Sequence, residues 1–373
     1  MNSTNLAFTQ EFFRSSKSCL SGHFKLLPSS SQQATLPTMK KSYLLFLLIW
    51  IPLLSHGQRT AVVGLSTGVV NYMGDLGNEK YFPFSSASPG AAVTLRNFLG
   101  GTRTSRTMYR PFDLQVRLSW HRLQYDETSD LGGKKGTELR NYNRGINFRN
   151  DLFGTEVGIT YTIYPNKMAP LWKPKFCFFF MAGIGAYFGK PKADLFNGSI
   201  DLKNKYYFWK DGTIRDVPEN KGAIGNVIEK DGDYETSLHD WLTEGQGYNR
   251  EIHSKQPYDL CNLGFPVGAG IRYIYSKELS FSAEFNYYYF LTDYLDDVSG
   301  RYATFDEIQS SFPDPTQYEL ARYISDPSGL GTSGYPGPAT SPRGNPGQSD
   351  SFTYVSIEAS YKFTWKKKGI YGQ

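Results

Sequence analysis

Residues 112–121 read Phe-Asp-Leu-Gln-Val-Arg-Leu-Ser-Trp-His, and this stretch decides the fold. Every second residue from Phe112 to Trp120 is apolar, and the residues between them are polar or charged. Side chains on a β-strand alternate between its two faces, so this period places the apolar groups on one face. The stretch therefore predicts a strand with one apolar face and one polar face.

Seven further segments have a similar length and pattern. The eight predicted strands are 60–73, 89–99, 112–125, 151–164, 176–188, 260–275, 279–291 and 352–365. Segments of about 10–14 residues suit tilted strands that cross a bilayer. A negative mean hydropathy with 16% aromatic residues fits strands that are apolar on one face only. We therefore expect an all-β protein, a single eight-stranded antiparallel transmembrane β-barrel of the outer membrane with long surface loops.

Alternation alone does not say which face points inward, because a soluble lipocalin-like barrel places its apolar face inside. Three features predict a polar interior. The polar faces are rich in glycine, which fits a narrow lumen, and aromatic residues gather near the strand ends, as they do at bilayer interfaces. The polar faces also carry charges of both signs that can pair across the lumen: Arg96, Arg117, Arg272 and Lys362 against Glu156, Glu284 and Glu358.

The connections between the predicted strands alternate in length. Long ones span 74–88, 126–150, 189–259 and 292–351, and short ones span 100–111, 165–175 and 276–278. Outer-membrane barrels have long surface loops and short periplasmic turns. We therefore expect the long connections to lie outside the cell and the short ones to lie in the periplasm.

Charge follows the same division. The long connections carry a net charge of −9, and the short ones together with the C-terminal tail carry +8 when Lys175, at the edge of the fifth strand, is left out. A basic rim can attract an acidic periplasmic partner, or it can serve solubility alone. The docking candidates on this rim are Arg103, Arg106, Arg110, Lys366, Lys367 and Lys368.

The first 57 residues are expected to be outside the mature barrel. Residues 39–57 combine Met-Lys-Lys, an apolar run and small residues, which is typical of a secretory signal peptide. The apolar run is shorter than the roughly 20 residues of a membrane-spanning anchor. Residues 1–38 lack a sustained period, and we expect them to be a mis-assigned N-terminal extension. The barrel then occupies 58–373, with its longest loops at 189–259 and 292–351.

Carboxylates gather where two predicted strands end. Asp293, Asp296 and Asp297 follow the seventh strand, and Asp75 follows the first. Three carboxylates in a loop can bind Ca²⁺. Alternatively, their oxygens accept backbone N–H groups where the strand ladder ends. We favour the second interpretation and keep Asp293, Asp296 and Asp297 as calcium candidates.

The sequence frames no recognisable active site. His121, His239 and His253 lack a nucleophile elbow or a paired-carboxylate spacing, so we expect no enzyme activity, no catalytic residues and no cofactor. Cys177 and Cys261 fall at opposite ends of the barrel, too far apart for a disulfide. Dispersed basic residues and the absence of a phosphate-binding loop exclude nucleic acid as an expected partner.

The segments 71–78, 147–150, 161–166, 292–300 and 343–346 together resemble one family, the PorG-like outer-membrane barrels of Bacteroidota. The most specific part is Tyr-Leu-Asp-Asp-Val-Ser-Gly at 294–300. The third long connection is longer here than the family pattern. The residues that carry the family motif are Asp75, Gly77, Asn78, Thr292, Asp293, Tyr294, Asp296, Asp297 and Gly300.

The resemblance implies an outer-membrane protein and, in the family's named case, a component of type IX protein secretion. That component is associated with a periplasmic ring made of a lipoprotein and its partner. We therefore expect a non-enzymatic structural or assembly component of secretion, embedded in outer-membrane lipid and docked through its basic rim. The alternatives are a barrel that binds ligands or cells through its surface loops and, more distantly, a lipid-modifying enzyme.

Overall fold

The computed structural model describes residues 60–76, 86–98, 102–104, 107–109, 111–128, 142–165, 175–220, 222, 224–246, 257–329 and 342–364. The expected N-terminal extension (1–38) and signal peptide (39–57) lie outside these residues. Within the described residues, no helix is long and apolar enough to cross a membrane.

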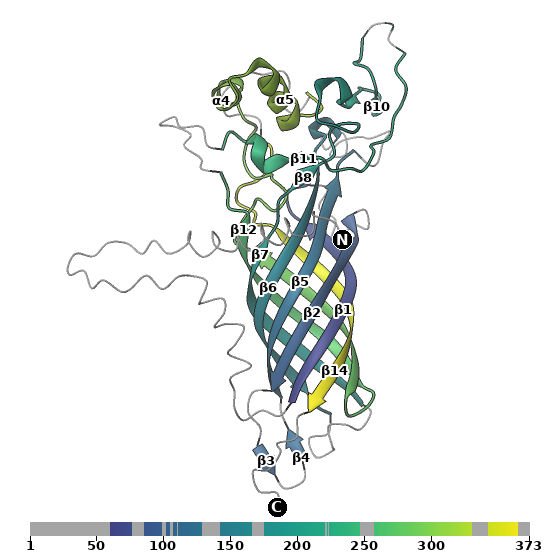
Figure 1. Cartoon of the computed structure of the whole chain (residues 1–373), viewed down its shortest axis with the longest axis vertical. Helices are drawn as coiled ribbons and strands as arrows, with labels where there is room; N and C mark the ends of the chain where they lie inside the picture. The colour runs from purple at the N-terminus through teal and green to yellow at the C-terminus, as the bar shows by residue number, and fades with distance from the viewer. Residues whose placement is uncertain are drawn as a thin grey trace, which may run out of the picture.

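Eight long antiparallel strands form a closed barrel (Figure 1). Each strand pairs with its neighbours in the chain, and the last strand pairs with the first from Thr60↔Thr364 to Met73↔Ser351. The strands are β1 (Thr60–Met73), β2 (Ser88–Phe98), β5 (Phe112–Asp126), β6 (Asn147–Ile163), β7 (Lys175–Phe188), β12 (Cys261–Ile274), β13 (Leu279–Phe290) and β14 (Ser351–Thr364). The predicted fold class and all eight predicted strands are confirmed.

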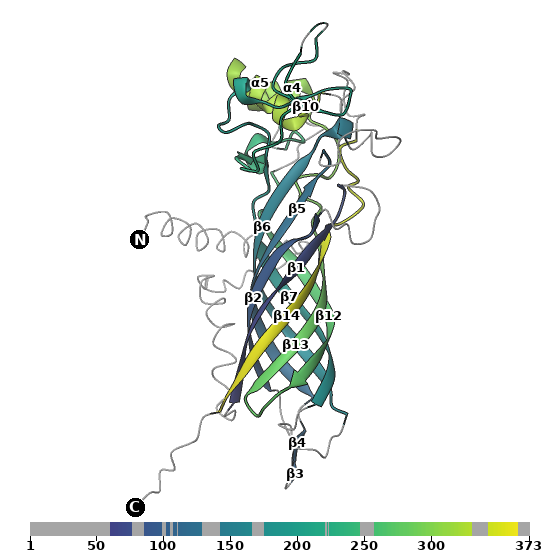
Figure 2. The ribbon, with the colours of Figure 1, turned by 90° about the vertical axis from the view of Figure 1, so that its right-hand side faces the viewer.

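One strand is longer than its sequence pattern indicated. β6 begins at Asn147, four residues before the predicted start. Its first residues pair with β5 as far as Asp126↔Asn147, whereas its pairing with β7 ends at Phe153↔Phe188. β5 and β6 therefore rise above the other strands at the end that carries the long connections (Figure 2).

The polar faces point into the lumen and the apolar faces point outward. On β14, Ile357 is 68% exposed, and its neighbour Glu358 is 2% exposed. The same alternation holds along β5, where Leu118 is 54% exposed and Arg117 is 1% exposed. A band of exposed apolar side chains around a closed sheet suits hydrocarbon, because every backbone hydrogen bond is satisfied between strands. The chain is therefore an outer-membrane barrel, as the sequence predicted.

Buried ion pairs fill the lumen. Arg96 donates to both carboxylate oxygens of Glu358, at 2.5 and 2.8 Å, and to Glu284 Oε1 at 3.3 Å. Arg117 donates to the other oxygen of Glu284 at 2.7 Å. We call these four residues the lumen ion network. Two arginines balance two glutamates in the lumen. The sequence predicted this pairing, because all four residues lie on the polar faces of their strands.

Glycines make room for this network. A Cβ atom on Gly64 would lie 2.5 Å from the Glu358 carboxyl carbon. A Cβ on Gly154 would lie 2.6 Å from the ring of Tyr187. Real carbon atoms do not approach so closely, so these two positions require glycine for space rather than for backbone freedom.

The two longest connections fold into one body, which we call the surface cap. It comprises the described residues of 189–259 and 292–350 (Figures 1 and 2). Cap residues such as Phe196 and Ile324 share a continuous hydrophobic core with Leu123 and Phe148 of the barrel. Its elements are β8 (Lys192–Ala193), η2 (Leu202–Asn204), β9 (Tyr207–Phe208), β10 (Ile214–Arg215), β11 (Thr236–Ser237), η3 (Leu238–Trp241), α4 (Phe305–Ser311) and α5 (Pro315–Ser325).

Both helices of the cap lie in a segment that was expected to be loop. Thr304 and Glu307 form a capping box at the start of α4, and Asp314 caps α5 just before Pro315. These are ordinary helix-start signals. At the opposite end of the barrel, the turn after β2 contains a small hairpin of β3 (Thr102–Thr104) and β4 (Thr107–Tyr109) (Figure 1).

Removing one charge from the lumen ion network should destabilise the barrel. Glu284→Gln leaves the buried guanidinium groups of Arg96 and Arg117 short of one negative charge, which costs about 3 kcal/mol or more in unfolding free energy. Urea unfolding of the protein refolded into lipid vesicles measures this loss. Glu278→Gln, at the exposed turn between β12 and β13, is the matched control and should change the value by less than about 0.5 kcal/mol. Equal stabilities for the two variants would contradict the proposed role of the network.

Candidate functional site at the outer end of the barrel

The family-motif stretch 292–300 leaves the end of β13 and folds into the protein. Leu295, Asp296, Asp297 and Val298 are each at most 1% exposed. At Asp297 the backbone φ is 70°, in the left-handed region that aspartate tolerates better than most residues. The two neighbouring aspartates have different partners.

Asp297 lies at the centre of the first cluster. It accepts hydrogen bonds from Thr243 Oγ1 at 2.5 Å, from the Tyr258 hydroxyl at 2.7 Å and from Arg343 Nη1 at 3.2 Å. Arg343 is 1% exposed and also lies 3.6 Å from Glu244. Burial raises the pKa of Asp297, and the Arg343 guanidinium opposes that rise. The cluster thus joins three distant segments of the cap to the motif.

Glu244 reinforces the same junction. Its Oε1 accepts hydrogen bonds from Ser299 N at 2.8 Å and Gly300 N at 3.1 Å, and its Oε2 lies 3.3 Å from the Tyr294 hydroxyl. The ring of Tyr294 stacks on Tyr258 with 4.6 Å between centroids. Sequence reasoning missed Glu244, because it is one of thirteen acidic residues in its connection and has no distinguishing spacing.

Asp296 belongs to a second cluster, around Tyr72 in β1. The Tyr72 hydroxyl donates to Asp296 Oδ2 and lies 3.4 Å from Asp350 Oδ1. Asp350 Oδ2 accepts from Leu295 N at 2.8 Å. Burial raises the pKa values of Asp296 and Asp350 well above their usual range, and each carboxylate raises that of its neighbours.

Asp75 connects this cluster to the first long connection. Its Oδ2 accepts from Asn345 N at 2.5 Å, and burial raises its pKa to about 6, opposed by that bond and by Arg144. Arg144 donates to the backbone carbonyls of Asp75 at 3.2 Å and Arg343 at 2.7 Å, and it pairs with Glu127. All four long connections therefore meet at the motif.

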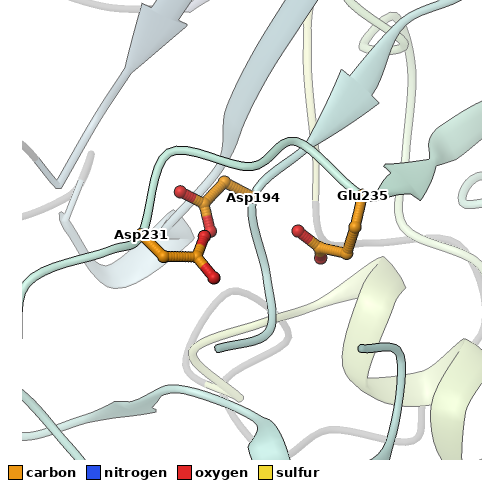
Figure 3. A group of neighbouring side chains, drawn as sticks. All are labelled: Asp194, Asp231 and Glu235. Atoms are coloured by element: carbon orange, nitrogen blue, oxygen red, sulfur yellow. The ribbon is translucent and has the colours of Figure 1, made fainter. Parts of the chain in front are cut away.

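Several motif residues accept hydrogen bonds from backbone N–H groups just beyond the end of the strand, as the favoured interpretation of the sequence expected. Asp296 Oδ1 accepts from Val298 N at 2.9 Å, and Thr292 Oγ1 accepts from Tyr294 N at 3.2 Å. Asp293 is half-buried, and its charge acts on Asp296 and Asp350. Gly77 and Asn78 lie outside the described residues. Among the described residues, the three carboxylates near enough to share one ion are not the predicted ones but Asp194, Asp231 and Glu235 (Figure 3).

A pocket of about 340 Å³ opens within the cap, between the β9–β10 hairpin and helices α4 and α5. Its walls include the aromatic residues Tyr206, Phe208, Tyr302, Phe305 and Tyr323. Two of the lining residues, Tyr302 and Ser325, carry buried hydroxyls that have no hydrogen-bond partner. Nothing in the sequence marked this pocket, because its walls come from segments about 100 residues apart.

The periplasmic docking candidates cannot be placed as side chains. Arg103 lies in strand β3, for which the structure describes the backbone alone. Arg106, Arg110, Lys366, Lys367 and Lys368 lie outside the described residues. The basic periplasmic rim stays a prediction from the sequence.

The described histidines and Cys177 contact neighbouring rings or backbone, or are buried. His121 lies in the lumen, 4.7–5.0 Å from the rings of Tyr288, Phe352 and Tyr354. His239 Nε2 contacts the Tyr258 carbonyl oxygen at 3.1 Å, and His253 lies outside the described residues. Cys177 is a buried thiol, so the expectation that it is not disulfide-bonded to Cys261 is confirmed.

Comparisons with known proteins identify no specific family. No family model matches the chain, and no curated protein matches it. Among solved structures, Neisserial surface protein A is similar over 83% of this chain and 98% of its own, with 7% identity and a TM-score of 0.28. Ail of Yersinia pestis, an attachment invasion locus protein, is similar over 82% of this chain and 99% of its own, with 7% identity and a TM-score of 0.29. The outer membrane enzyme PagL is similar over 82% of this chain and 99% of its own, with 8% identity and a TM-score of 0.25.

These likenesses are too distant to carry an argument about function. The barrel's own closure, apolar exterior and charged lumen show what the chain is: a small eight-stranded barrel of the outer membrane, with a folded cap at the end that carries its long connections.

Replacing Arg343 should release the cap while leaving the barrel intact. Arg343→Met strands Asp297 and Glu244 as buried, unpaired charges, a change that typically costs about 3–5 kcal/mol. Limited proteolysis of the vesicle-inserted protein should then cut the cap at least tenfold faster, while the heat-dependent gel shift of the barrel persists. Arg322→Met, which removes a half-exposed ion pair with Glu319, is the control and should leave the cutting rate nearly unchanged. Equal rates for both variants would mean that Arg343 does not hold the cap.

Proposed function

We propose that this protein is a non-enzymatic outer-membrane barrel that binds a ligand through its surface cap. The observation that carries the proposal is the pocket in the cap, lined by aromatic rings and by two buried hydroxyls without partners. A folded pocket on a membrane-anchored scaffold is a reason for a chain to keep long connections ordered.

The lumen supports a role at the surface rather than in transport. Arg96, Arg117, Glu284 and Glu358 are bonded to one another across the interior and are each at most 2% exposed. An eight-stranded interior is just wide enough to be filled by side chains. A solute path would have to break these ion pairs, which is costly.

The chemistry of the pocket favours a saccharide. Aromatic rings offer flat apolar surfaces, and the Tyr302 and Ser325 hydroxyls are polar groups that a ligand hydroxyl can satisfy. Arg322 and Glu319 add charged groups at the wall. Buried hydroxyls without partners are costly in a protein that has no use for them.

The non-enzymatic part of the proposal rests on the described histidines. His239 is bonded to a backbone carbonyl, and His121 is enclosed by rings in the lumen. Neither forms the hydrogen bond to a serine or cysteine that an activated nucleophile requires among the described residues.

Deleting one pocket hydroxyl should weaken binding without weakening the fold. The probe is an array of bacterial and host oligosaccharides, presented to the purified full-length protein in detergent. Tyr302→Phe should weaken the retained saccharide about tenfold, the value of one hydrogen bond of 1–1.5 kcal/mol, with unchanged unfolding.

Tyr318→Phe is the matched control, because Tyr318 lies on α5 outside the pocket wall and should bind as the wild type does. Removing residues 195–234 should abolish binding while the barrel still inserts. The proposal is overturned if the array retains no saccharide, or if the Tyr302 and Tyr318 variants bind equally well.

A second candidate function, in type IX secretion, is favoured by the sequence resemblance and by the charge division between the two ends of the barrel. In this role the basic rim would dock a periplasmic ring formed by a lipoprotein and its partner. Long-range attraction between oppositely charged surfaces would steer this contact.

The test of this second role is a mild-detergent pull-down of the tagged protein from its own membranes, read by mass spectrometry. Periplasmic ring subunits should be recovered with the wild type. They should be lost when Arg103, Arg106, Arg110 and Lys366 to Lys368 are changed to Gln, but kept when the exposed cap residues Lys203 and Lys210 are changed instead. Recovery of the barrel without periplasmic subunits would reject the secretion role and leave the surface role in place.

A further inference from the structure

We propose that Asp194, Asp231 and Glu235 form a calcium-binding site within the surface cap, beside β8 and β11 (Figure 3). This inference does not rest on the proposed saccharide pocket. None of these three residues belongs to the family motif or to the calcium candidates that the sequence suggested.

The spacing of the three carboxylates suits one Ca²⁺ ion. One oxygen from each lies within 4.8 Å of the others. Two ligands on opposite sides of a Ca²⁺ ion, each at about 2.4 Å, are about 4.8 Å apart. Figure 3 shows the carboxylates of Asp194 and Asp231 next to each other, with that of Glu235 on the other side pointing toward them.

Two of the carboxylates carry a buried oxygen that no donor meets in good hydrogen-bond geometry, although the Tyr206 hydroxyl acts on the Asp194 carboxylate. Asp194 is 2% exposed, and its Oδ1 has no hydrogen-bond partner. The buried Oε2 of Glu235 also lacks one. A buried carboxylate oxygen without a donor or a cation costs several kcal/mol, so both atoms indicate a missing positive ligand.

Backbone N–H groups hold one oxygen of Asp194, one oxygen of Glu235 and both oxygens of Asp231 in place. Asp194 Oδ2 accepts from Gly232 N at 2.8 Å, and Glu235 Oε1 accepts from Leu195 N and Phe196 N, both at 3.1 Å. The exposed Asp231 accepts from Gly198 N at 2.7 Å. The oxygens that remain are positioned before any ion arrives.

The surrounding charges leave this group net negative. Lys230 acts favourably on Asp194, but its ammonium bonds Asp126 at 3.1 Å. The Tyr206 hydroxyl also lies beside Asp194 and accepts from Asp231 N at 3.0 Å. A divalent cation is the simplest compensation for three such carboxylates.

The donor set selects calcium among common ions. All three ligands are carboxylate oxygens from loop segments, and no histidine or cysteine contributes, as zinc would require. Magnesium demands a near-ideal octahedron and keeps most of its water, whereas calcium accepts irregular sets of six to eight oxygens. Water and the exposed side of Asp231 supply the remaining positions.

An ion here would fasten the hairpin that walls the pocket. Asp194 follows β8, and Asp231 and Glu235 flank the turn that leads into β11. Tyr206, which contacts this group, precedes β9 and lines the pocket. Calcium would therefore order the β9–β10 hairpin against the rest of the cap.

The test is isothermal titration of Ca²⁺ into the EDTA-treated full-length protein, held in detergent micelles free of phosphate-bearing lipid. The expected dissociation constant is about 10⁻⁴–10⁻³ M, as in other extracellular calcium sites. Glu235→Gln and Asp194→Asn keep the backbone hydrogen bonds but remove a charge, and each should weaken binding at least tenfold. Asp233→Asn, which changes an exposed carboxylate in the same turn, is the matched control and should bind normally.

Limited proteolysis gives a second readout that does not depend on calorimetry. Ca²⁺ should slow proteolysis of the β9–β10 hairpin in the wild type and the Asp233 variant, while Mg²⁺ at the same concentration should not. The inference is overturned if the wild type binds no Ca²⁺ at about 10⁻² M. It is also overturned if the Asp233 variant loses as much affinity as the Glu235 variant, because general surface charge would then explain the binding.

Discussion

The structure depends on one constraint: a charge on the inner face of a narrow closed barrel must find its counter-charge inside. Glu284 satisfies two arginines at once, and Arg96 in turn pairs with Glu358 on β14, two strands away from β2. These bonds link β2, β5, β13 and β14 across the interior rather than along the sheet. Gly64 faces the Glu358 carboxylate, which occupies the space that a side chain on Gly64 would need.

The cap applies the same solution outside the membrane. Arg343 is as buried as Arg117, and it neutralises Asp297 and Glu244 from different connections. The residues of 292–300 thus serve mainly to bring the long connections together. This explains how a segment with the composition of a loop can be buried: its aspartates accept the backbone N–H groups that strands and helices would otherwise satisfy.

Sequence analysis predicted the barrel almost completely, because a period of two residues is a local signal that survives in each strand separately. It placed the start of β6 too late, since residues 147–150 alternate weakly and pair with β5 and β8 but not with β7. It missed α4 and α5, although Thr304, Glu307 and Pro315 were available as start signals. The partners of Asp297 and the grouping of Asp194 with Asp231 and Glu235 join residues about 40 or more apart. A single sequence does not reveal such contacts, because no fixed spacing between the residues marks them.

The unequal strand lengths have a geometric consequence. Six residues of β6, from Asn147 to Leu152, continue beyond the last pair with β7, which is about 20 Å of strand at 3.3 Å per residue. They remain hydrogen-bonded to β5, and Arg149 pairs with Lys192 of β8 in the cap. The cap is therefore carried on a stiff ribbon that rises from one side of the barrel. The connection between barrel and cap on this side is hydrogen-bonded sheet rather than loop alone.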